Sequence, residues 1–279
     1  MVHLRRGIHI YREPSGGEFD GAIYGPLCYL LGAALINPSQ PSYLPLRLLS
    51  LAATLGLSVL AALLVFRLTK SKIGAALAPL LVLSAAYVGR YGISARADMV
   101  ALLLSTTGFF VFYTNRESRR SQAIAAGLML LSFFYKQQFI GAPVAVLLYF
   151  LISRRLRDAA TFALLLTAGG LLLVGVFAFL VFPNQPFVNH FLMYNHLPFE
   201  KRLLLPEILM FVVPLFVPLL GSADFVESQR DFLLKCYAIV PAVLYFFLLF
   251  SSGSGADTNR CLEGAFILMC LLAARIATA

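Results

Sequence analysis

The stretch GISARADMVALLLSTTGFFVF, from Gly92 to Phe112, places Arg96 and Asp98 at the start of a long apolar run. From Met99 onward the stretch carries no charged residue. Such a run is typical of a helix that enters a membrane, whose hydrocarbon takes about 20 apolar residues to cross. Ionisable groups beside such a helix are costly and tend to face a cavity or a substrate path. This stretch therefore predicts both a membrane helix and a candidate site for the two ionisable residues at its start.

The composition of the whole chain points to the same solvent. Of its 279 residues, 60% are hydrophobic and 13% are charged, and the mean hydropathy is +0.84. A soluble domain is about a quarter charged. We therefore expect an integral membrane protein, with membrane lipids as its surroundings.

Apolar runs recur along the chain and predict an all-α, polytopic bundle of about eight or nine spanning helices. The expected helices cover residues 45–66, 73–89, 98–114, 122–135, 139–153, 159–182, 205–221 and 233–250, with a ninth apolar stretch from 262 to the end. The run from Ala22 to Ile36 is too short to cross, since a helix rises only 1.5 Å per residue. We expect it to form an interfacial helix within a first segment, 1–45, that precedes the bundle of 46–279.

The net charge of +9 is spread over short connections rather than gathered on one soluble domain, so we expect no nucleic-acid partner. The basic residues lie in RLTKSK (67–72), NRESRR (115–120), SRRLRD (153–158) and ESQRDFLLK (227–235), at every second connection. This alternation is typical of cytoplasmic loops. We interpret these residues as solvated orientation signals that touch no substrate.

Neither a leader nor a metal site is indicated. Residues 1–21 carry no apolar segment of the kind found in signal peptides. The four cysteines, Cys28, Cys236, Cys261 and Cys270, show no metal-ligand spacing. We therefore expect no metal and no cofactor.

Alternation of the connections places a second set of polar residues on the outer face. That set contains Asp20, Arg96, Asp98, Lys136, His190, His196, Arg202, Asn259, Arg260 and Glu263. These residues do not resemble orientation signals, and their collection on one face indicates a polar site there.

Several of these residues also have purely structural interpretations. On a helix, Arg96 and Asp98 would point to different sides and could not pair with each other, so each is expected to find its own partner. Asp98 also fits the cap of the helix that follows, and Lys136 fits a lysine that extends along a helix end toward water.

The outer loops leave similar alternatives open. His190 and His196 are six residues apart and have no carboxylate cluster nearby, so they make a weak metal site. Asn195, His196 and Arg202 could bind a phosphate or a sugar hydroxyl, or simply solvate a loop. Asn259 and Glu263 share a helical face, while Arg260 and Glu263 fit an ordinary ion pair.

Five segments, in order, resemble a known family. They are GIHIYREP with YGPLCYLL and LPLRLLSL, ISARADMVALLL, SFFYKQQFIGAP, NHFLMYNHLPFEKRLLL, and GADTNRCLEG. In this order they resemble the bacterial polytopic glycosyltransferases of the GT-C class, relatives of protein O-mannosyltransferases and of the aminoarabinose transferases that modify lipid A. The resemblance covers nearly the whole chain.

The resemblance implies an inverting glycosyltransferase of the bacterial inner membrane, with its active face in the periplasm. Such enzymes transfer a sugar from a polyprenyl-phosphate carrier to a glycan, lipid or protein acceptor. The chemistry requires a carboxylate base and cations that stabilise the departing lipid phosphate. The implied cations are Arg96, Lys136 and Arg202, and Tyr24 in YGPL shapes the donor site; Asn195, His196, Asn259 and Glu263 complete the expected substrate-binding set.

One departure from the family concerns the catalytic base. Family members normally begin with a helix that leads into an acidic residue acting as this base, and here Met1 follows that point. We expect either a truncated chain or a substitution of that acid by Asp20 or Asp98. A lipid-linked substrate transporter or flippase is the alternative, although such proteins show matching halves that this sequence lacks.

Overall fold

The computed structural model describes residues 1–11, 22, 24–192, 218, 220–223, 232–251 and 262–279. Within these residues every regular element is a helix, which confirms the all-α expectation. Two short helices come first: α1 (Val2–Arg5) and α2 (Pro26–Leu35). The bundle follows with α3 (Leu44–Thr69), α4 (Lys72–Ser84), α5 (Ala86–Gly92), α6 (Asp98–Thr114), α7 (Arg119–Tyr135), α8 (Gly141–Ile152), α9 (Leu156–Gly175) with its π-helical extension η1 (Val176–Val181), α10 (Phe187–Leu192), α12 (Phe232–Ser251) and α13 (Leu262–Ile276).

Most helices lie where the apolar runs predicted them, but several are shorter than a complete crossing. Among the described residues, two helices are long and apolar enough to span a membrane, Leu44–Thr69 and the continuous Leu156–Val181. The expected span 73–89 is divided into α4 and α5 by extended backbone at Ala85. The expected span 205–221 falls mostly outside the described residues.

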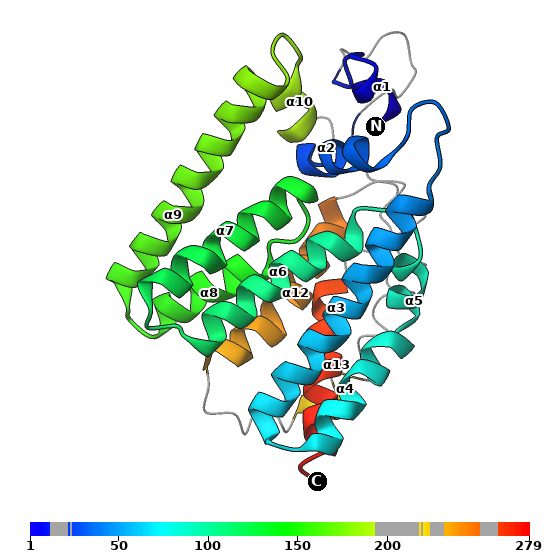
Figure 1. Ribbon diagram of the computed structural model, residues 1–279. Helices are drawn as coiled ribbons and strands as arrows, with labels where there is room; N and C mark the ends of the chain where they lie inside the picture. Colours follow the sequence, from blue (N-terminus) through cyan, green and yellow to red (C-terminus); the bar gives the residue numbers. More distant parts are fainter. Residues whose placement is uncertain (12–21, 23, 193–217, 219, 224–231, 252–261) are drawn as a thin grey trace.

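Antiparallel neighbours bring alternate connections to the same end of the bundle. At one end, Arg67 Nη2 donates to the Thr114 carbonyl oxygen at 3.3 Å, which joins the last turns of α3 and α6. At the other end, Ser50 Oγ donates to the Arg96 carbonyl oxygen at 3.3 Å. We call the first end the Glu117 end, because Glu117 lies there just after α6. We call the second end the Asp98 end, because α6 begins there at Asp98. Helix α2 lies across the Asp98 end (Figure 1).

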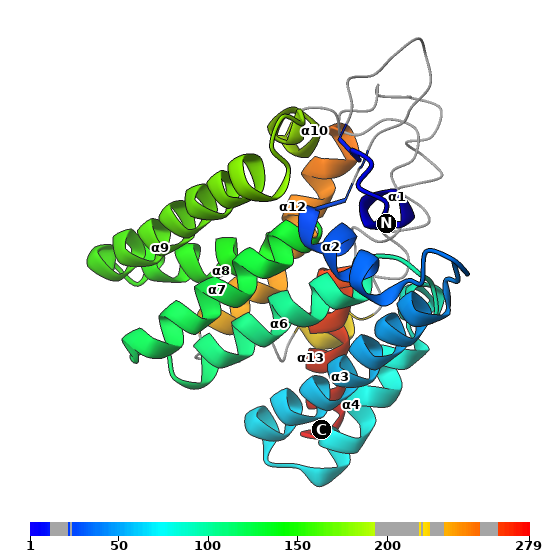
Figure 2. The ribbon, with the colours of Figure 1, turned by 45° about the horizontal axis from the view of Figure 1, so that its top comes forward.

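Helix α13 forms the centre of the bundle. It packs against α3, α4, α6 and α12 and runs between them toward the C-terminus (Figure 2). Its residues from Leu262 to Leu268 are all buried, and apart from Glu263 they are apolar, as expected for a helix in the core of a bundle. By contrast, α3 exposes a leucine-rich stripe that includes Leu48, Leu55 and Leu63, and this stripe suits contact with lipid.

Candidate functional site

Asp98 is a fully buried carboxylate at the first residue of α6. Its residue exposure is 0%. Oδ1 forms an ion pair with Lys136 Nζ, and Oδ2 lies 3.3 Å from Arg96 Nε. The N-cap residue of α6 is Ala97, and no side-chain hydrogen bond caps this helix. Asp98 is therefore held by two cations rather than by the backbone N–H groups that a capping aspartate would accept.

The contact between Arg96 and Asp98 corrects the expectation that each residue would need a separate partner. That expectation assumed that both residues lie on one helix. The helix begins only at Asp98, so Arg96 lies before it, and the non-helical backbone lets the side chain turn back. Arg96 also places Cζ 5.0 Å from the ring centre of Tyr91 at the end of α5.

Lys136 lies directly after α7 and points inward. Its side chain is 7% exposed, which is contrary to the expectation of a lysine that reaches water. Nζ is 5.1 Å from the ring centre of Tyr24, a cation–π distance. Burial lowers the pKa of the Lys136 ammonium, and the adjacent Asp98 carboxylate opposes this change.

Tyr24 is brought to Lys136 by the glycine that follows it. Gly25 N donates to the Tyr135 carbonyl oxygen at 3.2 Å, and a Cβ on Gly25 would overlap the Phe134 carbonyl oxygen. Only glycine lets this segment lie directly against the end of α7. Burial raises the pKa of the Tyr24 hydroxyl, and the nearby Arg96 guanidinium opposes this effect.

We call Tyr24, Arg96, Asp98 and Lys136 the buried charge cluster. Four of the residues predicted for the site thus lie together, although they are separated by up to 112 positions in the chain. Two cations and one carboxylate leave one net positive charge at an apolar bundle end. Such an arrangement can bind an anion, because charge-assisted hydrogen bonds to phosphate are strong.

Glu263 lies apart from this cluster. Its carboxylate accepts hydrogen bonds from Ser105 Oγ at 2.8 Å, Tyr237 Oη at 3.2 Å, Gly141 N at 3.0 Å and Ala142 N at 2.9 Å. Ser105 follows Asp98 by seven residues, which is about 10 Å along α6. Ser105 and Tyr237 gave no sequence signal of this role, because these contacts depend on how α6 and α12 pack against α13.

Of the remaining residues expected on the outer face, His190 belongs to the part of the chain that the structure describes. The positions that lie outside the described residues are Asp20, Asn195, His196, Arg202, Asn259 and Arg260. His190 is described and buried, with its ring centre 5.6 Å from that of Tyr11. In the described parts of the chain, no three side chains of His, Cys, Asp or Glu are grouped as metal ligands.

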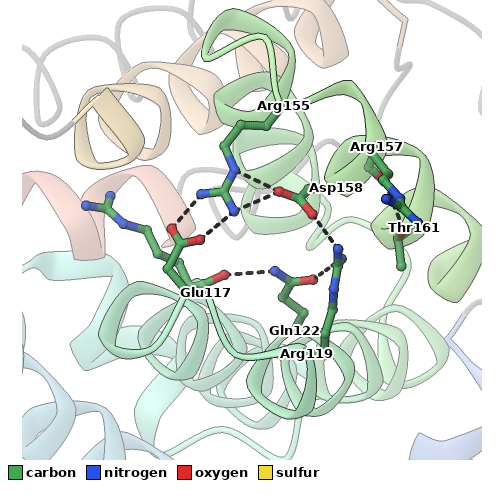
Figure 3. Close-up of polar contacts among 8 residues, drawn as sticks. Glu117, Arg119, Gln122, Arg155, Arg157, Asp158 and Thr161 are labelled. Carbon is green, nitrogen blue, oxygen red and sulfur yellow. Dashed lines mark hydrogen bonds and ion pairs between the residues drawn. The ribbon is translucent and has the colours of Figure 1, made fainter.

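The connections at the Glu117 end hold a second set of charges (Figure 3). Arg155 Nη1 and Nη2 donate to the two Glu117 oxygens at 2.6 and 2.7 Å. Arg155 Nε donates to Asp158 Oδ2 at 2.8 Å, and Arg119 Nη2 lies 2.7 Å from Asp158 Oδ1. Arg119 also donates to Gln122 at 3.1 Å. We call these five residues the loop network.

The loop network changes the interpretation of the basic connections. Arg119 and Arg155 are not simply solvated, because they join the α6–α7 and α8–α9 connections through two carboxylates. Glu117 remains 72% exposed in its side chain, and the hydrogen bonds from Arg155 hold its pKa below the usual value. The acidic residues within NRESRR and SRRLRD were the sequence signal for these pairs.

No family model and no curated protein matches this sequence. Among solved structures, the crystal structure of ArnT from Cupriavidus metallidurans bound to undecaprenyl phosphate is similar, with a TM-score of 0.63 and 17% sequence identity. The match covers 99% of this chain and 53% of the ArnT chain, so this chain spans about half the length of ArnT. The likeness shows a shared helical fold and agrees with the GT-C-like architecture that the sequence resemblance implied.

Proposed function

We propose that this protein is a multi-pass membrane glycosyltransferase that takes a sugar from a polyprenyl-phosphate carrier. The observation that carries the proposal is the buried ion pair of Asp98 with Lys136 at one end of an apolar bundle. Burying charges is costly, and within a membrane protein such groups are generally functional. Structural likeness to a protein crystallised with undecaprenyl phosphate, itself a polyprenyl phosphate, supports the choice of carrier.

In this proposal the cations of the cluster bind the carrier phosphate. Arg96 is the more accessible of the two, with a side chain that is 31% exposed. Its guanidinium offers several donors in a planar fork that matches phosphate oxygens. Lys136, which is paired with Asp98, adds a second positive charge. The Lys136 ammonium also lies against the Tyr24 ring. This charge would stabilise the phosphate as it leaves the sugar.

The transfer step needs a base for the acceptor. The acceptor hydroxyl oxygen forms a bond to the anomeric carbon, the bond from that carbon to the phosphate oxygen breaks, and the base takes the hydroxyl proton. Asp98 and Asp20 are the proposed carboxylates. Both oxygens of Asp98 already face cations, so we propose that Asp98 orients Lys136 and Arg96. Asp20 is then the proposed base.

The bundle orientation follows from the basic connections. The Glu117 end carries Arg67, Lys70, Lys72, Arg116, Arg119, Arg120, Arg154, Arg155 and Arg157, and an excess of such residues favours the cytoplasmic side. We therefore propose that the Asp98 end faces the periplasm of a bacterial inner membrane. Residues 1–45 would then form a segment over the site and 46–279 the bundle.

The test is sugar transfer by the full chain in vesicles that contain a radiolabelled polyprenyl-phosphate sugar and mixed lipid acceptors. The proposal expects labelled product and released polyprenyl phosphate, with product lost in Asp98→Asn. Movement of labelled carrier between leaflets without any product would instead identify a transporter. Absence of both activities would contradict the proposed function.

A further inference from the structure

Helix α8 begins inside the bundle rather than at its end. Lys136 lies at the Asp98 end, residues 137–140 are not helical, and α8 starts at Gly141. The start of α8 bonds to Glu263, which also bonds to Ser105, about 10 Å along α6 from Asp98. A four-residue connection therefore links the buried charge cluster to the interior of the bundle.

The start of α8 is capped by a carboxylate from another helix. The first N–H groups of a helix have no partners within it, and the N-cap residue Ile140 makes no side-chain cap. Gly141 N and Ala142 N instead donate to the two oxygens of Glu263, at 3.0 and 2.9 Å. Leaving such N–H groups unsatisfied in an apolar interior would be costly.

Glu263 is itself fixed from three directions. Ser105 on α6 and Tyr237 on α12 both donate to Oε1, and Glu263 lies in the first turn of α13. The amino-terminal ends of α8 and α13 both favour a negative charge at this point. A Cβ on Gly141 would lie 2.5 Å from Glu263 Oε2 and 2.8 Å from Pro241 Cγ, so the close approach requires glycine.

We propose that Glu263 is a positioning residue that holds the 136–142 segment and thereby keeps Lys136 against Asp98. It acts through the backbone of α8 and does not itself contact the carrier. This inference rests on the proposed function for its consequence in transfer, but the restraint on the segment can be measured separately. The family resemblance implies a substrate-binding role for Glu263, but its four hydrogen bonds to protein donors favour the positioning role instead.

The first measurement is amide hydrogen exchange of the full chain in nanodiscs, for the wild type and Glu263→Gln. Glutamine matches the shape of glutamate, but it can keep the three bonds to Oε1 only by turning its NH2 group toward Gly141 N–H. We expect exchange at 136–146 to rise by about tenfold or more, because a hydrogen bond to a charged group is lost. Exchange at 116–122 should stay unchanged; a uniform rise would indicate general destabilisation and overturn the proposal, as would no rise at 136–146.

The second measurement separates positioning from general stability. If Glu263 acts through Lys136, Glu263→Gln lowers transfer in the wild type but causes no further loss in a Lys136→Met background. Equal fractional losses in both backgrounds would overturn the proposal. Gly141→Ala should reproduce the exchange pattern from the other side of the contact. Thr106→Val is the matched control, because the Thr106 hydroxyl bonds only to the backbone of its own helix.

The two measurements also separate this inference from the proposed function. If the wild type transfers no sugar, the proposed function fails, and the exchange at 136–146 alone decides whether Glu263 restrains Lys136. If the wild type transfers sugar and Glu263→Gln changes neither exchange nor transfer, only the positioning role fails.

Discussion

The two ends of the bundle both hold ion pairs, but the carboxylates after which the ends are named differ in exposure. At the Asp98 end, the side chains of Asp98 and Lys136 are 0% and 7% exposed. At the Glu117 end, the side chains of Glu117 and Arg119 are 72% and 56% exposed. Each end even places a cation over a tyrosine, Lys136 over Tyr24 at 5.1 Å and Arg116 over Tyr149 at 5.5 Å.

Ion pairs alone therefore do not identify a site. An exposed ion pair contributes at most about 1 kcal/mol to the free energy of unfolding, so its loss has little effect on stability. A buried pair exacts a desolvation cost, so its presence needs a reason beyond stability.

The largest effect is expected for Asp98→Asn. The substitution leaves Lys136 buried opposite a neutral group, and loss of one partner of a buried pair typically costs about 3–5 kcal/mol. We expect sugar transfer to fall by about 100-fold or more, as is typical when a preorganised electrostatic group is removed. Denaturant unfolding in micelles and the vesicle transfer assay measure the two effects. Wild-type transfer by a folded Asp98→Asn would remove Asp98 from the site.

The double variant Asp98→Leu with Lys136→Met separates chemistry from stability. Replacing a buried pair with apolar side chains is often neutral or stabilising, so unfolding free energy should return to within about 1 kcal/mol of the wild type. Transfer should remain as low as in Asp98→Asn. Recovery of transfer together with stability would mean that the cluster is only a structural feature.

A smaller effect is expected from Gly25→Ala. The added Cβ overlaps the Phe134 carbonyl oxygen, so the Tyr24 segment must move away from Lys136 at a cost of about 1–3 kcal/mol. Thermal unfolding and tyrosine accessibility to iodination follow the change. Gly127→Ala is the control, because a Cβ there meets no atom within 4 Å. Equal stability of the two variants would contradict the close packing of this segment.

The smallest effect is expected for Glu117→Gln in the loop network. The loss should be at most about 1 kcal/mol and should fade in high salt, with transfer unchanged. Since the pKa of Glu117 is lowered in the folded state, its contribution is present above the ordinary pKa of 4.5 and is lost as the pH falls through the lower folded value. Unfolding measured at neutral and acidic pH tests this. A large loss of transfer would make the loop network part of the site.

The fold class and the members of the cluster were predictable from sequence, but several of their contacts were not. Apolar runs located the helices because hydropathy follows burial in lipid. The contact of Arg96 with Asp98 was missed because their spacing was judged by helical geometry, although Arg96 precedes the helix that was expected to begin at residue 98 and does begin there. The partners of Glu263 were missed because an apolar run does not reveal that α8 begins inside the bundle at Gly141.

The loop network was partly visible in the sequence. Glu117 and Asp158 stood among arginines, and Arg155 with Asp158 has ordinary i,i+3 spacing. The bridge from Arg155 to Glu117 joins two different connections, so it required knowledge that the α6–α7 and α8–α9 connections lie side by side. Helix-end pairing of this kind is set by tertiary packing rather than by local pattern.

Binding of a polyprenyl phosphate to the buried charge cluster can be tested by photolabelling. An undecaprenyl phosphate analogue with a diazirine beside the phosphate would be bound to the wild-type chain in nanodiscs, irradiated and mapped to peptides. We expect labelling near Tyr24, Arg96 and Lys136, and we expect unlabelled undecaprenyl phosphate to reduce it. Labelling concentrated near Arg119, Tyr149 and Arg155, or equal labelling at both ends, would contradict it.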